Sequence, residues 1–266
     1  MLESVAYESY GARLQIRSND PEILRDADQC AQQALIGHLK PITSGPFDIV
    51  IDLIRDGSLY RMERNGEYMS SGPVEERSMK FLDGIIRISV GEYAKDLVIL
   101  HAGAVAWQGK GLIFPADSFR GKSSLVSELV RAGAEYYSDD FAIIDRKGGL
   151  HPFPRPISMR TRDGRHDPYE VNPQDLRATV GRRAVPVRMV FFTEYRRHAR
   201  WLPTVLSSGE GILKAITYTL PLRRDPDLCL KVLNTVAARA IMAKSHRGDA
   251  RRTARFLLDF LDSVEK

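Results

Sequence analysis

The chain has 266 residues, a formal net charge of +5 and 43% hydrophobic residues, enough for one large domain or two small ones with a proper core. No apolar run approaches the roughly 20 residues that a membrane-spanning helix needs, and the N-terminus has early acidic residues and no apolar core, so neither a membrane partner nor a secretory signal is expected. The two cysteines, Cys30 and Cys229, are far apart and are expected to be buried free thiols in a reducing cytoplasm.

Residues 1–95 are expected to form a small α+β unit. The sequence Asn19-Asp20-Pro21-Glu22 begins a helix, because a capping residue precedes a proline at the first helical position. Asn65-Gly66 favours the turn of a hairpin. The predicted elements are a strand at 10–18, a helix from Pro21 to about Leu39, a strand at 47–54, a hairpin at 58–69 and a helix at about 74–92.

The next stretch, 97–107, predicts a strand, a turn of small residues and a second strand. His101 lies at the end of the first apolar run, among small neighbours that leave room for a ligand. Such a histidine is either structural or faces an active site. Residues 111–114 then predict a buried strand.

The segment Ala116-Asp117-Ser118-Phe119-Arg120-Gly121-Lys122-Ser123 meets the phosphate-loop pattern G-x-x-x-x-G-K-[ST], except that Ala116 replaces the first glycine. A helix is predicted from Lys122 to Ala132, ended by Gly133. Loop amides and the helix N-terminus would then face an anion. Lys122 would reach the outer phosphates of ATP, and the Ser123 hydroxyl would hold Mg²⁺. The remaining candidate nucleotide contacts are Asp117, Ser118, Phe119, Arg120, Gly121 and Ser124. The alternative is an ordinary strand–turn–helix corner, because alanine tolerates a positive φ less easily than glycine.

Two adjacent carboxylates, Asp139 and Asp140, end the strand predicted from residue 134, and a further strand follows at 141–145. Phosphoryl transfer needs a metal, a phosphate cradle and a group that activates the attacking hydroxyl. One carboxylate would bind Mg²⁺ and the other would act as general base, with Asp140 as the candidate beside Ser123 at the metal. The sequence does not decide between the two roles, and a solvated Asp-Asp turn is the alternative.

The rest of the chain is rich in arginine. Residues 152–186 predict irregular loops over the site, followed by a strand at 185–193 and helices at 207–220, 225–244 and 249–264. Arg155 and Arg160 are candidates to contact the phosphates or an acidic substrate, since guanidinium pairs bidentately with both. The alternative is a solvated face. Nucleic acid is not expected as a partner, because no aromatic residues interleave the arginines and no predicted helix resembles a recognition helix.

Residues 97–146 resemble the catalytic core of the HPr kinase/phosphorylase family, P-loop kinases related in fold to phosphoenolpyruvate carboxykinase. The matching runs are 101–105, 117–124 and 133–140. The resemblance implies an α/β fold with a P-loop core, a mixed sheet and flanking helices over residues 96–266. It also implies that His101 lies beside the catalytic pair Asp139 and Asp140, while Lys122 and Ser123 serve phosphate and metal. Residues 152–157 look like a stretch in relatives that are not HPr kinases proper.

The implied activity is an ATP-dependent kinase that transfers the γ-phosphoryl group to a hydroxyl, with ATP and Mg²⁺ bound. The acceptor would be a serine on a peptide or protein, or a small alcohol. The alternative is an ATP-binding switch or scaffold with little or no phosphotransfer, which Ala116 and the bulky pair Phe119-Arg120 favour. A homo-oligomer is compatible with the sequence, which does not settle the oligomeric state.

Overall fold

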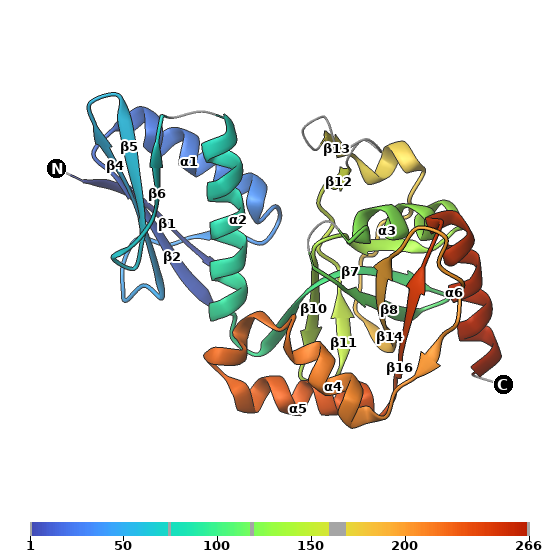
Figure 1. Ribbon diagram of the computed structural model, residues 1–266. Coiled ribbons are helices and arrows are strands. Elements are labelled where there is room, and N and C mark those ends of the chain that lie inside the picture. The colour runs from blue at the N-terminus through green and yellow to red at the C-terminus, as the bar shows by residue number, and fades with distance from the viewer. Residues whose placement is uncertain (1, 74–75, 118–119, 160–168, 265–266) are drawn as a thin grey trace. The chain divides into compact units, whose positions relative to one another are not determined.

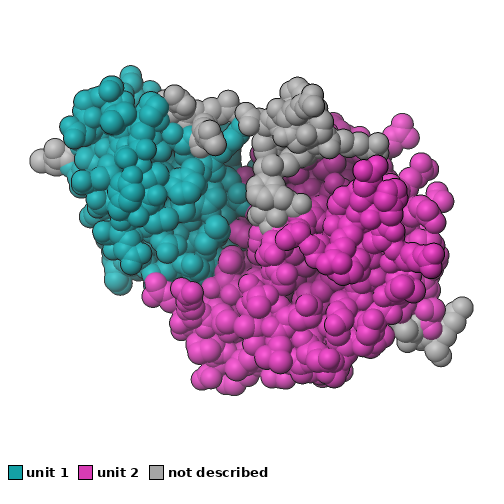
Figure 2. Space-filling view, in the orientation of Figure 1, with its two compact units in different colours: residues 1–96 teal, residues 97–266 magenta. Residues whose placement is uncertain are grey.

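The computed structural model describes residues 2–73, 76–117, 120–159 and 169–264 (Figure 1). The chain forms two compact units, Met1–Asp96 and Leu97–Lys266, one residue from the expected boundary (Figure 2). Both units combine strands and helices, and the described residues contain six α-helices, so the α/β class is confirmed. Within these residues no helix is long and apolar enough to cross a membrane.

The first unit is a six-stranded sheet with the order β3-β1-β2-β4-β5-β6. Asp20 caps α1 by accepting the amides of Glu22 and Ile23, and the hairpin of β5 and β6 turns at Asn65-Gly66, both with positive φ. Apolar residues of α1 and α2 pack with those of the sheet in one core. The bounds are β1 Glu3–Ser9, β2 Ala12–Ser18, α1 Pro21–Ala34, β3 Lys40–Pro41, β4 Ile49–Asp56, β5 Leu59–Arg64, β6 Glu67–Gly72 and α2 Glu76–Tyr93.

Two predictions for this unit were wrong in extent. Strand β1 was missed because its polar residues hide the alternation, and the predicted strand start at Tyr10 is instead a tight turn in which Tyr10 and Gly11 have φ of 49° and 78°. Helix α1 ends at Ala34 and not near Leu39, because Leu35 leaves the helical region at φ −121°.

The second unit is built on an eight-stranded mixed sheet with the order β11-β10-β7-β8-β14-β16-β15, in which β9 also pairs with β7. Strands β8, β14 and β16 are adjacent and parallel, so their C-terminal ends meet at one edge, where open α/β sheets bind ligands. The bounds are β7 Leu97–Trp107, β8 Lys110–Pro115, β9 Glu135–Ser138, β10 Phe141–Asp145, β11 Gly149–His151, β14 Val185–Tyr195, β15 Thr204–Val205 and β16 Ile241–Arg247.

Helices cover both faces of this sheet (Figure 1). Helices α3 (Lys122–Arg131) and α6 (Ala250–Val264) pack on one face with Leu112 and Phe114, whereas α4 (Ser208–Ile216) and α5 (Pro226–Ala237) pack on the other with Ile113. The alternation along β8 thus separates two apolar layers. Helix α3 lies close to β7 because Gly103 has no side chain: a Cβ there would lie 2.7 Å from Val126 Cγ2.

The largest error of the sequence analysis concerns the helix predicted at 225–244. Helix α5 ends at Ala237, and strand β16 begins at Ile241 between β14 and β15. This strand contains Met242, Ala243 and Lys244, which favour helices, so local propensity conflicts with the tertiary pairing. The predicted helix at 207–220 also ends early, at Ile216, and a 3₁₀ turn follows at Leu220–Arg223.

Two further stretches differ from expectation. Residues 97–107 form one uninterrupted strand, without the predicted turn of small residues. The region 152–186 contains a small two-stranded sheet of β12 (Ile157–Met159) and β13 (Tyr169–Val171) and a 3₁₀ turn at Pro173–Leu176. Cys30 and Cys229 are both free and buried, as predicted.

Candidate functional site

The loop between β8 and α3 presents a helix N-terminus at the edge of the sheet. Gly121 precedes the helix in the left-handed conformation, with φ 86° and ψ 24°, and as a glycine it has no side chain to cap the first amides of α3. Ala116 does not have a positive φ, so alanine is accommodated where the pattern has its first glycine. Ser118 and Phe119 lie outside the described residues. Uncapped amides at a helix start attract an anion.

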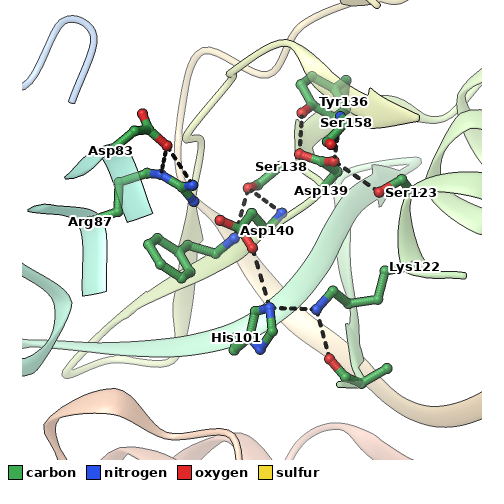
Figure 3. Close-up of polar contacts among 12 residues, drawn as sticks. Asp83, Arg87, His101, Lys122, Ser123, Tyr136, Ser138, Asp139, Asp140 and Ser158 are labelled. Atoms are coloured by element: carbon green, nitrogen blue, oxygen red, sulfur yellow. Dashed lines mark hydrogen bonds and ion pairs between the residues drawn. The ribbon is translucent and has the colours of Figure 1, made fainter. Parts of the chain in front are cut away.

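Lys122, the first residue of α3, folds back toward the loop and toward β7. Its Nζ donates to the Ala116 carbonyl at 2.7 Å and lies 2.6 Å from His101 Nε2 (Figure 3). Burial lowers the pKa of Lys122 to about 8, against the opposing charges of Asp139 and Asp117. Loss of hydration thus disfavours the charged form of Lys122 by more than the two carboxylates favour it.

His101 and Asp140 lie together because β7 and β10 pair side by side. His101 is opposite Phe141 in this pairing, and Ala102 donates its amide to the Asp140 carbonyl at 2.9 Å. The same Nε2 that contacts Lys122 lies 3.3 Å from Asp140 Oδ1. A neutral imidazole nitrogen either donates or accepts, so the contacts with Lys122 and Asp140 compete.

Asp139 points to the other side, toward the start of α3. Its side chain is buried, at 6% exposure, and Oδ2 accepts from the Ser123 hydroxyl and the Ser158 amide, each at 3.0 Å. The Tyr136 hydroxyl lies 3.4 Å from Oδ1. Burial, followed by the Asp139 charge, raises the pKa of Tyr136. The two carboxylates thus have separate partners: Asp139 contacts Ser123 of α3, and Asp140 contacts His101 (Figure 3).

Two of the three candidate arginines lie within the described residues. Arg120 forms an ion pair with Glu194 on β14. The Arg155 carbonyl accepts from the Tyr136 hydroxyl at 2.8 Å, and its guanidinium charge acts on Tyr136, which brings Arg155 to the Asp139 side of the site. Arg160 lies outside the described residues. Asp117 and Ser124 are exposed beside Lys122 and Ser123.

The structure adds residues that sequence reasoning missed. Arg247, at the end of β16, donates through Nη2 to the Gly121 carbonyl at 2.6 Å. Tyr136 and Ser158 hold Asp139 from the side opposite the loop. Correct assignment of β16 would have marked Arg247, because it ends a strand parallel to the one that precedes the loop.

A metal with few protein ligands fits this arrangement. Within the described ranges, no group of three or more His, Cys, Asp and Glu could hold a metal ion. Mg²⁺ bound with a nucleotide takes most of its ligands from phosphate and water, so the hydroxyl–carboxylate pair of Ser123 and Asp139 suits it.

The amino-acid sequence matches no protein-family model and no curated protein.

Proposed function

We propose that the protein is an ATP-dependent kinase that transfers the γ-phosphoryl group to a hydroxyl. One observation carries the proposal: the first two residues of α3 each contact a different group of active-site candidates. Lys122 contacts His101, which in turn contacts Asp140. Ser123 contacts Asp139. A phosphate cradle, a metal position and a base are the parts that phosphoryl transfer requires, and the two hydrogen-bonded groups that begin at Lys122 and Ser123 would supply them.

The cradle would consist of the amides at the start of α3 and the Lys122 ammonium. The amides carry the positive end of the helix dipole, and the N-cap residue, Gly121, has no side chain to cap them. Lys122 is half-buried, its Nζ contacts the Ala116 carbonyl and His101, and burial lowers its pKa to about 8. A phosphate would supply the missing negative charge, and Lys122 would turn from the Ala116 carbonyl to meet it.

The metal position would be formed by Ser123 and Asp139. The hydroxyl and the carboxylate already contact each other at 3.0 Å, and the Ser158 amide fixes the carboxylate. When bound, Mg²⁺ would neutralise charge on the phosphates. This geometry favours Asp139 as the metal partner over Asp140, the candidate from the sequence, which did not decide between the two.

Asp140 would then act as the base for the acceptor hydroxyl. The contact with His101 keeps the Asp140 carboxylate near Lys122, the residue that would bind the γ-phosphate. With Lys122 turned to the phosphate, His101 Nε2 would be released to donate to Asp140 and to orient it. The carboxylate would receive the hydroxyl proton as the oxygen attacks.

The family resemblance gives the proposal its finer form, an HPr-kinase-like P-loop kinase. Support comes from the strand–loop–helix unit at 110–131, from the contact of Asp139 with Ser123, and from His101, which contacts both Asp140 and Lys122. The proposed acceptor is a serine on a peptide or protein, or a small alcohol. The nucleotide contacts of Arg155 and of the exposed loop residues belong to the same proposal.

The test begins with binding, measured by calorimetric titration of Mg·ATP. Wild type should bind, Lys122→Ala should bind at least tenfold more weakly, and Lys147→Ala, on an exposed turn, should match wild type. Failure of wild type to bind at millimolar Mg·ATP would overturn the proposal.

The second test separates the two aspartates by following γ-phosphoryl transfer to a library of serine peptides and small alcohols. Asp139→Asn should raise the Mg²⁺ concentration needed for half-maximal rate, whereas Asp140→Asn should lower kcat by a factor on the order of 10² to 10⁴ with ATP binding intact. Binding without transfer to any acceptor would instead favour an ATP-binding switch.

A further inference from the structure

Arg247 ends β16 in an environment unusual for a cation. The residue is only 2% exposed, and across the ranges that the structure describes no ion pair joins it to a carboxylate. Its Nε atom is buried and has no hydrogen-bond partner among the described residues. Burial lowers the pKa of the guanidinium, against the opposing effects of Tyr195 and Asp249. A buried cation without a paired carboxylate costs stability, so its position calls for another explanation.

The hydrogen bonds of Arg247 go to backbone carbonyls. Nη2 donates to the Gly121 carbonyl at 2.6 Å and lies 3.5 Å from that of Arg120, while Nη1 lies 3.3 Å from the Gly248 carbonyl. The guanidinium carbon also lies 5.8 Å from the centre of the Tyr195 ring. Two of the three carbonyls therefore belong to the loop before α3.

These contacts determine where the loop amides point. In a trans peptide the carbonyl and the following N–H point in opposite directions. The Gly121 carbonyl is held by Arg247 and by the Leu125 amide at 3.2 Å, so the Lys122 N–H of the same peptide points away from Arg247, out of the helix start. The Arg120 carbonyl orients the Gly121 N–H in the same way. Both amides would face an anion at the N-terminus of α3.

Glycine at position 121 matches this contact. Its φ of 86° is a conformation that side chains disfavour, and a Cβ at this position would lie 2.2 Å from Arg247 Nη2. The loop glycine and the strand arginine therefore fit each other directly, although they are far apart in the sequence.

We infer that Arg247 is the positioning residue of the phosphate cradle, and that it orients the Gly121 and Lys122 amides before a polyphosphate binds. This inference rests on the proposed function. An arginine suits the task because one planar nitrogen carries two hydrogens for two consecutive carbonyls, whereas lysine offers a flexible point charge. Pre-oriented donors bind an anion without the cost of ordering them at that moment.

The test compares Arg247→Lys, which keeps the charge, with Arg247→Met and with a matched control, Arg131→Met, at the exposed end of α3. Calorimetric titrations use Mg·ATP and inorganic triphosphate. Wild type and Arg131→Met should bind alike, and both Arg247 variants should bind about tenfold more weakly.

Nuclear magnetic resonance supplies a readout that a merely structural role would not move. Labelling arginine with ¹³C at the carbonyl and glycine with ¹⁵N selects the two Arg-Gly pairs of this sequence, Arg120-Gly121 and Arg247-Gly248. The second pair disappears in Arg247→Lys, which assigns the first. The Gly121 amide proton should move downfield when triphosphate binds to wild type, and it should start from a different position in Arg247→Lys.

The outcomes separate this inference from the proposed function. Wild type that does not bind Mg·ATP would overturn both. Wild-type binding that Lys122→Ala weakens but Arg247→Lys leaves unchanged, with an unmoved Gly121 resonance, would overturn the role of Arg247 alone. Weak binding by Arg247→Met with normal binding by Arg247→Lys would mean that charge acts without positioning, and would also overturn it. Tyr195→Leu provides the test if the Arg247 variants do not fold, because it changes a half-exposed ring beside the guanidinium. This variant should bind triphosphate about threefold more weakly and shift the Gly121 resonance. An unchanged affinity would count against the inference.

Discussion

Replacement of Lys122 by methionine should alter the pH dependence of stability. Burial lowers the pKa of this lysine from 10.5 to about 8. Between these values the unfolded chain binds more protons than the folded one, so the free energy of unfolding rises as pH rises from about 8 to 10.5. Below pH 8 the folded protein bears the full cost of the buried ammonium.

The magnitude follows from about 1.4 kcal/mol per pKa unit. Between pH 7 and 9.5 the linkage relation gives about 2 kcal/mol for wild type, and partial access of solvent reduces this to about 1–2 kcal/mol. Lys122→Met has no titrating group at this position and loses that gain. Relative to the variant, wild type should therefore be about 1–2 kcal/mol more stable at pH 9.5 than at pH 7.

The assay is urea unfolding at 25 °C at both pH values, with Lys147→Met as the control for a lysine on an exposed turn. Comparison with the variant cancels every other group that titrates in this range. Equal changes with pH in wild type and Lys122→Met would refute the reasoning. A second consequence concerns the ligand: Mg·ATP affinity should be constant below pH 8 and fall above it, because the phosphate needs the charged lysine.

The remaining predictions concern packing and the thiols. Gly103→Ala should lower the free energy of unfolding by about 1–3 kcal/mol in urea titrations, because its Cβ would lie 2.7 Å from Val126 Cγ2. Gly84→Ala, in α2 with nothing within 4 Å, should raise it by about 0.5–1 kcal/mol, and a loss there would contradict the helical assignment. Cys30 and Cys229 should resist a thiol reagent until urea unfolds the chain, since both are buried and burial raises the pKa of Cys229 to about 11; fast labelling of the native protein would show that they are accessible.

Local signals in the sequence predicted much of the architecture. The Asp20-Pro21 helix start, the Asn65-Gly66 turn and the apolar run into Lys122 each depend on neighbours in the chain, and each was confirmed. Strand β16 could not be predicted in this way. Its residues favour a helix, and only the pairing with β14 on one side and β15 on the other makes them a strand.

The candidate site shows the same division. The spacing of Lys122, Ser123 and the aspartate pair along the chain is a sequence property, and the structure brings these residues together with His101. Which aspartate meets which partner depends on the turn between β9 and β10, which sends consecutive side chains to opposite sides. Arg247 was missed because its role depends on β16.

The position of β16 has a consequence for the order in which the second unit can be assembled. In chain order it is the last strand, yet in space it lies inside the sheet, beside β14. A nascent chain that has not reached residue 241 leaves the apolar edge of β14 unpaired and the loop before α3 without Arg247, a state prone to edge-to-edge association. The core of the first unit consists of residues between Tyr7 and Val90, which are synthesised long before β16. Chain shortening before residue 241 should therefore produce an aggregating second unit while residues 1–96 still fold.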